Sequence, residues 1–259
     1  MLDIREFVDL EQLQRIQDLF SNATGLAAIA VAADGKYITR GSNFTDFCMK
    51  YTRGSKLGAE RCIQCDNECT GTYFCHAGLM DFSSDIIIEG EKVGAIIGGQ
   101  VLPNHPDEDK FREIAKELGI NENAYISALN KVPVRDEQTI RAAAELLGLT
   151  VNLLCEFQYR RHIERRRIDT FNEELGNISK NISSAKNHMK DLHNTATMEN
   201  ILAINANVEA AHAGKAGVGF AVVAGEIGQL SRQSAEVYKL IEDIVDSIQQ
   251  SVNKIKNER

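Results

Sequence analysis

Proline and long apolar runs are scarce in this sequence of 259 residues, and each absence excludes something. All three prolines precede residue 134, so nothing in the second half interrupts a long helix. No segment reaches the ~20 apolar residues of a membrane span, and the acidic start MLDIREFVDL lacks the basic and apolar regions of a signal peptide. We therefore expect a cytoplasmic protein, in which the six cysteines stay reduced.

Positive charge is also in short supply. Lys and Arg number 29 against 37 Asp and Glu, which gives a formal net charge of -8. This balance disfavours a polyanionic partner, so we expect neither nucleic acid nor a membrane surface among the partners. The content of 43% hydrophobic and 25% charged residues is typical of soluble globular proteins, and the length allows two domains.

The first half, residues 1–160, predicts an α+β domain. A helical apolar pattern in LEQLQRIQDLF is followed by an apolar run that ends at the turn dipeptide Asp34-Gly35. The stretch DIIIEGEKVGAIIGGQVL predicts a hairpin whose turn, residues 89–92, contains Gly90. Helices are expected from a cap near Asp107 to Gly119, over residues 122–129, and from about residue 136 onward.

The second half, residues 161–259, has the periodicity of a coiled coil. Apolar or small residues recur at 168, 171, 175, 178, 182, 185, 189, 192 and 196, and again at 227, 230, 234, 237, 241, 244, 248 and 255. A glycine-rich stretch between the two series predicts an antiparallel helical hairpin. One hairpin buries only one apolar seam, so we expect a homodimer that forms a four-helix bundle.

The stretch ILAINANVEAAHAGKAGVGFAVVAGEIGQLS, residues 201–231, resembles the signalling tip of bacterial methyl-accepting chemotaxis proteins. The resemblance implies a truncated signalling hairpin whose tip, near residues 205–222, docks a chemotaxis histidine kinase and its coupling adaptor. By this resemblance Asn205, Glu209 and Phe220 lie at contacts between dimers. The resemblance also implies that the adaptor side is formed by Ile201, Ile204 and Val222.

The tip also departs from the family pattern. His212, Val218 and Gly228 stand where that family usually has basic residues, which we expect to weaken docking of the kinase. With arms that end at Arg259, we expect no methylation sites unless Gln249 or Gln250 serves as one.

Four stretches of the first half are similar to the PocR sensory domain, a PAS-like module: SNFTDFC (42–48), CIQCD (62–66), YFCHAGLMDF (73–82) and EGEKVGAIIGGQVL (89–102). The resemblance implies a pocket for a small organic molecule such as a short diol. Polar residues that interrupt apolar runs are the candidate ligand contacts, although each could instead cap a helix or a turn. They are Ser42, Asn43, Asp46, His76, Asp81 and Gln100.

Four of the six cysteines lie close together in the sequence. Cys62 and Cys65 form a C-x2-C pair that could chelate zinc on a tight turn. Cys69 and Cys75 could complete the shell, with Cys48 and His76 as substitutes. The same thiolates could hold an iron–sulfur cluster, two of them could form a redox switch, and all could be small core residues.

Together these features predict a soluble chemoreceptor-like signal transducer, not an enzyme. It would sense a small organic ligand in the first half and signal through the hairpin tip. One alternative is a metal-based or iron–sulfur redox sensor with the same output. A second is a thiol- or metal-dependent oxidoreductase, against which stands the lack of a phosphate loop, nucleotide motif or acid–base pair. A third is an assembly protein whose tip only builds dimers or trimers of dimers.

Overall fold

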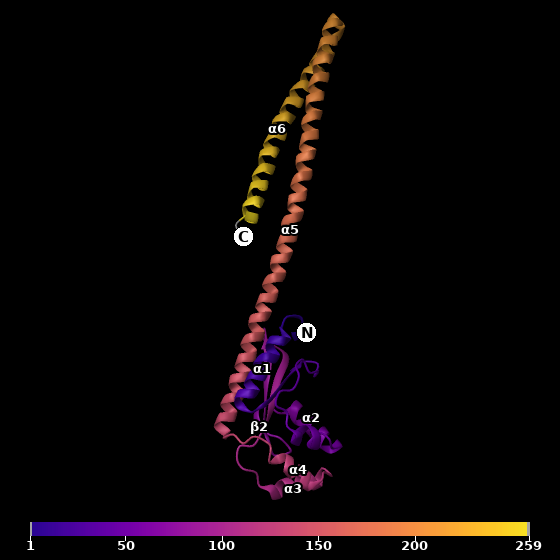
Figure 1. Cartoon of the computed structure of the whole chain (residues 1–259). Helices are drawn as coiled ribbons and strands as arrows, with labels where there is room; N and C mark the ends of the chain where they lie inside the picture. Colours follow the sequence, from indigo (N-terminus) through magenta and orange to yellow (C-terminus); the bar gives the residue numbers. More distant parts are fainter. Residues whose placement is uncertain (1, 258–259) are drawn as a thin grey trace. The chain divides into compact units, whose positions relative to one another are not determined.

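The structure is a computed structural model that describes residues 2–257, so that Met1, Glu258 and Arg259 lie outside it. The chain divides into two compact units, Met1–Arg165 and Arg166–Arg259, here called the first and second units. One helix, α5, contributes to both (Figure 1). Among the described helices, none is long and apolar enough to cross a membrane.

The first unit contains a short 3-10 helix, a π-helical segment, a sheet and several α-helices, which confirms the predicted α+β class. In chain order the elements of this unit are η1 (Ile4–Glu6), α1 (Leu10–Thr24), β1 (Ala27–Ala32), η2 (Phe47–Thr52), α2 (Lys56–Glu68), β2 (Gly71–Phe74), β3 (Met80–Ile88), β4 (Glu91–Val101), α3 (Glu108–Glu117), α4 (Glu122–Leu129) and the first part of α5 (Glu137–His212).

The four strands form one antiparallel sheet in the order β1-β4-β3-β2. Glu89 and Gly90 make the predicted turn between β3 and β4, with φ values of 52° and 79°. Two positive φ values match the right-handed twist of paired strands, which is why glycine suits this turn. The other predicted turn, at Asp34-Gly35, also forms, but the returning chain makes only the single bridges Val31↔Tyr37 and Ala28↔Ser42 instead of a strand.

The two faces of the sheet have different neighbours because side chains alternate along each strand. One face packs against α1 and α5 in a core that includes Leu13, Phe82, Ile96, Leu147 and Val151. A second core joins η2, α3 and α4 and includes Phe47, Leu79, Phe111, Tyr125 and Leu129.

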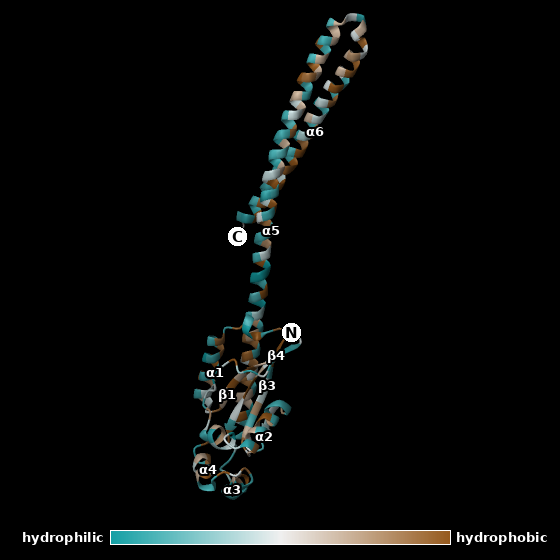
Figure 2. Cartoon of the chain, turned by 90° about the vertical axis from the view of Figure 1, so that its right-hand side faces the viewer, coloured by the Kyte–Doolittle hydropathy of each residue, from teal (hydrophilic) through white to brown (hydrophobic). Residues whose placement is uncertain are grey.

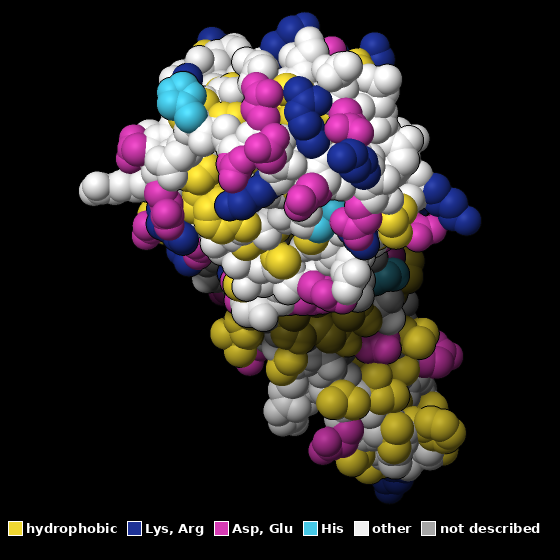
Figure 3. Space-filling view, turned by 90° about the horizontal axis from the view of Figure 1, so that it is seen from below, with side chains coloured by type: hydrophobic (Ala, Val, Ile, Leu, Met, Phe, Trp, Pro, Cys, Tyr) yellow, Lys and Arg dark blue, Asp and Glu magenta, His cyan; other side chains and the backbone are white. Residues whose placement is uncertain are grey.

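Several helix ends lie where the sequence predicts them. Asp107 is the N-cap residue of α3, Gly119 follows that helix with φ 68°, and α4 spans the predicted residues 122–129. The face that carries α3 and α4 has acidic and basic side chains interspersed (Figure 3), as in the pairs Arg112–Glu108 and Lys116–Glu122. Neither positive nor negative charge therefore dominates that face.

The second unit is the predicted antiparallel hairpin. The rest of α5 forms its first arm, η3 (Gly214–Gly217) its turn, and α6 (Val218–Asn257) its second arm. Hydrophobic residues recur along both arms (Figure 2). On α5 the buried residues are spaced by seven, as a coiled-coil seam requires: Leu175, Ile182, Met189, Ala196, Ala203 and Ala210.

On α6 the prediction of the seam is wrong for contacts within one chain. The buried side chains are Ala224, Ser231, Val245 and Val252, which are also multiples of seven apart, together with Gly228. Apart from the half-buried Ser234, the predicted series on this helix is instead exposed, as at Leu230, Val237 and Ile244. Small residues at the inner positions let the two arms approach closely. The large apolar side chains are left on another face.

We expect Gly217→Ala to loosen the hairpin turn, because the added Cβ would lie 2.0 Å from the carbonyl oxygen of Ala210. The matched control is Gly219→Ala, whose Cβ meets nothing within 4 Å, and which should stabilise α6 by up to about 1 kcal/mol. Hydrogen exchange of residues 205–225 should become faster in the first variant and not in the second. Equal exchange in both would contradict the close contact.

Candidate functional site

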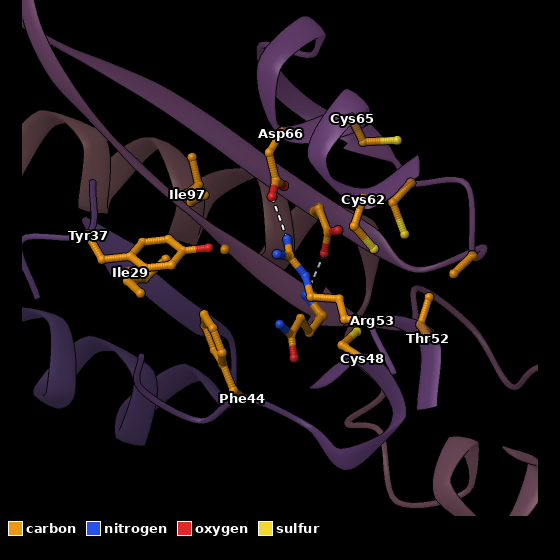
Figure 4. A pocket seen from close by; sticks show the side chains of 15 residues that line it. Ile29, Tyr37, Phe44, Cys48, Thr52, Arg53, Cys62, Cys65, Asp66 and Ile97 are labelled. Atoms are coloured by element: carbon orange, nitrogen blue, oxygen red, sulfur yellow. Dashed lines mark hydrogen bonds and ion pairs between the residues drawn. The ribbon is translucent and has the colours of Figure 1, made fainter. Parts of the chain in front are cut away.

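A small cavity lies on the face of the sheet away from α1 and α5 (Figure 4). Its volume is about 40 Å³, room for only a few non-hydrogen atoms. The strands contribute apolar walls, such as Ile29 and Ile97, and the loop before η2 contributes Phe44. Polar and sulfur-containing lining residues come from η2, α2 and the neighbouring loops and strands: Tyr37, Cys48, Thr52, Arg53, Cys62, Cys65, Asp66, Cys75, Asp81 and Gln100.

An ion pair forms part of the cavity wall. The guanidinium of Arg53, which follows η2, lies 2.5 Å from the carboxylate of Asp66 on α2. Both side chains are 25% exposed, so the ion pair is partly buried and still in contact with water. Removing one partner would leave the other charge partly buried and unpaired, which is costly. The pair therefore fixes α2 against the chain segment after η2.

A second carboxyl, that of Asp81, points to the cavity from β3. Its Oδ1 accepts a hydrogen bond of 2.7 Å from the backbone N–H of Gln100. The Gln100 side-chain oxygen accepts hydrogen bonds from both the backbone N–H and the hydroxyl of Thr45. Burial raises the pKa of Asp81 to about 7, and this hydrogen bond only partly opposes the effect. The site thus holds a carboxyl that changes charge near neutral pH.

Three thiols at the cavity, those of Cys48, Cys62 and Cys75, are held in their protonated form. Burial is the largest cause that raises the pKa of Cys62, to about 11, and it also raises the pKa of Cys48 and Cys75. The sulfur of Cys62 lies 3.2 Å from Nε2 of His76, whose own pKa is lowered by burial. A neutral thiol forms only a weak hydrogen bond with a neutral imidazole. The Cys62 thiol is therefore not an activated nucleophile.

The cysteines do not form a set of metal ligands in this arrangement. Cys62 and Cys65 lie one helical turn apart on α2, not on the predicted tight turn, and Cys69 caps the end of that helix. Across residues 2–257, no group of three or more His, Cys, Asp or Glu side chains could hold a metal ion. The nearby Arg53 guanidinium would also repel a cation. Zinc and an iron–sulfur cluster thus do not fit these residues as they lie, and metal binding stays a prediction.

Of the six predicted ligand contacts, the cavity brings together Asp81 and Gln100. Ser42 is instead buried against α1, where its hydroxyl accepts from Gln17 and donates to Asp18. Asn43 has φ 53° and donates to the carbonyl of Ser21. Asp46 is exposed at the start of η2, and His76 does not line the cavity.

Sequence reasoning missed the residues Arg53, Asp66, Tyr37 and Phe44. Asp66 and Phe44 lie within the quoted PocR-like stretches, so their positions could have been noticed. Nothing in the sequence signals that Arg53 pairs with Asp66, because the contact depends on how α2 packs.

The six predicted tip residues are all exposed. Phe220 is 76% exposed, and Ile201, Ile204 and Val222 are each more than half exposed. His212, which replaces an expected basic residue, has Nδ1 3.8 Å from the carboxylate of Glu209. Exposed apolar side chains beside a tight bend are typical of a protein-binding surface.

Comparison with known families decides the identity of both halves. The model of the sensory domain found in PocR matches residues 6–159. The chain belongs to the PocR sensory-domain family. The model of the methyl-accepting chemotaxis protein signalling domain matches residues 158–258. A PocR sensory domain is therefore followed directly by a chemoreceptor signalling domain.

Regulatory protein PocR of Salmonella typhimurium is 30% identical over 156 residues, which cover 54% of this chain and 49% of that protein. Methyl-accepting chemotaxis protein McpC of Bacillus subtilis is 40% identical over 88 residues, covering 34% of this chain and 13% of McpC. Methyl-accepting chemotaxis protein IV of Escherichia coli is 50% identical over 66 residues, which cover 24% of this chain and 12% of that protein. The chain thus spans about half of the first relative and less of the others, and no solved structure matches it.

We expect Asp81→Asn to change how the stability of the PocR domain depends on pH. The folded protein keeps the Asp81 proton up to about pH 7, whereas the unfolded chain releases it near pH 4, so wild-type stability should fall between these values. The variant lacks this loss and should gain on the order of 2–4 kcal/mol relative to wild type between about pH 4 and pH 8. Urea unfolding at a series of pH values measures it.

The control is Asp46→Asn, which removes an exposed carboxyl that does not line the cavity. Comparison with this variant separates the effect of losing the carboxyl at the cavity from that of losing one acidic side chain elsewhere in the domain. A stability difference for Asp81→Asn that does not change with pH would show that the Asp81 carboxyl is not held neutral.

Proposed function

We propose that this chain is a soluble, cytoplasmic chemoreceptor-like signal transducer that binds a small organic ligand in its PocR domain and acts on a chemotaxis kinase and adaptor as a homodimer. The observation that carries the proposal is α5, a single helix of 76 residues that supplies core residues to the PocR domain and also the first arm of the signalling hairpin. A ligand that changes the packing of this helix in one domain would change it in the other.

The cavity beside Asp81 and Gln100 supports a small ligand with few charges. Its size limits the occupant to a few non-hydrogen atoms, as in a short diol. A neutral Asp81 carboxyl can both donate and accept a hydrogen bond, and the side chain of Gln100 lies nearby. The apolar walls, Ile29, Ile97 and Phe44, suit the carbon atoms of such a molecule.

The hairpin supports the proposed action on a kinase and its adaptor. Its tip exposes Phe220, Ile201 and Val222, and α6 leaves large apolar residues uncovered within one chain. In a four-helix bundle of two copies, those α6 residues would be buried. The absence of the usual basic residues at His212, Val218 and Gly228 makes weak kinase binding part of the proposal.

Filling the cavity should weaken ligand binding. Ile97→Phe adds side-chain volume at the cavity wall, and we expect it to weaken binding of two- to four-carbon diols at least about tenfold, or about 1.4 kcal/mol. The control is Ile87→Phe, at an exposed position that does not line the cavity. Isothermal titration calorimetry compares the two. Binding that is equally strong in both variants would place the ligand elsewhere.

The tip should transmit the signal. We expect Phe220→Ala to lower kinase regulation at least about tenfold in a reconstituted mixture with the coupling adaptor, because truncation of a central aromatic contact costs about 2 kcal/mol or more. Leu202→Ala is the matched control, since Leu202 is 67% exposed near the tip but is not among the predicted contacts. The measurement is the rate of kinase autophosphorylation. A chain that changes this rate under no condition would be an assembly protein instead.

A further inference from the structure

A second hollow lies beside the small cavity on the same face of the sheet, and we call it the outer hollow. Its walls come from β1, β3, β4, the turn after β1 and α2. Its volume is about 250 Å³, several times that of the cavity. The residues that line the outer hollow but not the cavity include Ile63, Asn67, Ser83 and Lys92. The outer hollow therefore offers space that the cavity lacks.

Four residues line both hollows and so form the wall between them: Tyr37, Arg53, Asp66 and Ile97. Arg53 and Asp66 are joined by their ion pair, and Tyr37 points its hydroxyl toward Arg53 (Figure 4). Tyr37 is 58% exposed, so its ring can turn aside with little loss of packing. A ligand longer than the cavity can therefore extend past this wall into the outer hollow.

The guanidinium of Arg53 has hydrogen-bond donors to spare. Within residues 2–257 its side chain donates through Nη2 to Asp66, whereas a guanidinium carries several more N–H groups. Because the side chain is only 25% exposed, the remaining donors have limited access to water. An acceptor on a ligand would satisfy them, and a carboxylate matches the fork of a guanidinium with two parallel hydrogen bonds.

The lining of the outer hollow also has an excess of positive charge. Arg53 and Lys92 are its basic residues, and Asp66 is its acidic residue. Lys92 also pairs with Asp85 outside the lining, but Lys92 is more than half exposed, so the attraction between them is weak. The chain as a whole carries a formal charge of -8, so this excess is a local feature. One negative charge on a ligand would balance it.

We propose that the ligand of the PocR domain is a short hydroxy acid that spans both hollows, with its hydroxyl in the cavity at Asp81 and Gln100 and its carboxylate in the outer hollow at Arg53. The inference rests on the proposed function and narrows its ligand class to molecules with one anionic end. A neutral Asp81 carboxyl can hydrogen-bond the hydroxyl without repelling the carboxylate. Arg53 keeps its bond to Asp66 and binds the ligand through its other donors.

Isothermal titration calorimetry of the full chain at about pH 6, below the pKa of Asp81, tests the second subsite. The probes are terminal hydroxy acids of three to five carbons, the diols with a hydroxyl at each end, and the acids without a hydroxyl. We expect the best hydroxy acid to bind at least about tenfold more tightly than the diol of equal length, because it adds a charged hydrogen-bonded contact at Arg53. It should also bind several-fold more tightly than the plain acid, which cannot hydrogen-bond Gln100.

A paired variant, Arg53→Gln with Asp66→Asn, removes both charges of the wall together and leaves no unpaired charge behind. It should lose the preference for the hydroxy acid over the diol. The matched control, Arg141→Gln with Glu137→Gln, removes an exposed ion pair of α5 that lines neither hollow, and it should keep the preference. Lys92→Gln, at an exposed position that tolerates change, should weaken binding of the hydroxy acid by up to about fivefold and leave the diol unaffected.

Several results would overturn the second subsite. A diol that binds wild type as tightly as the hydroxy acid would do so and leave the proposed site in the cavity intact. A plain acid that binds as tightly as the hydroxy acid would show that one ligand does not span both hollows. A preference that survives both in the paired variant and in Lys92→Gln would remove the carboxylate from Arg53. Binding of none of the probes would contradict the proposed small-ligand site as well.

Discussion

The structure depends on one constraint, which is that a single helix must satisfy two hydrophobic cores. Within α5, Leu147 and Val151 are buried against the sheet, whereas Leu175 and Ile182 are buried against α6. No proline occurs after Pro133, so no residue type forces a break between these two tasks. The faces used differ, because a strict heptad on a helix of 3.6 residues per turn drifts by about 20° each seven residues. The helix therefore has apolar side chains left over on faces that neither core uses.

The large apolar residues of α6 follow from the same constraint. Contacts within one chain use small residues, Ala224, Gly228 and Ser231, near the turn, so that the two arms can lie close together. Larger residues such as Leu230 and Val237 then have no place in that seam. In the proposed dimer, a bundle of four helices would remove these side chains from water.

Periodic features could be predicted from the sequence, and contacts between distant segments could not. The ends of α3 and α4, the Glu89-Gly90 turn and the two arms follow from local patterns. The C-x2-C pair lies on α2 and not on the expected tight turn, and the spacing alone does not distinguish the two, since residues three apart face the same way on a helix as well as on a turn. Of the candidate site, Asp81 and Gln100 were predictable because each interrupts an apolar strand. The Arg53–Asp66 pair was not, since it joins a loop to a helix whose packing decides the contact.

The small cavity limits how a ligand could change the packing of α5. A ligand of about five non-hydrogen atoms gains at most about 7 kcal/mol on binding, and only its difference in affinity between two packings moves the equilibrium. Turning a helix pair almost completely from one state to another takes about 5.5 kcal/mol. A receptor with such a ligand must therefore hold its two states within a few kcal/mol of each other.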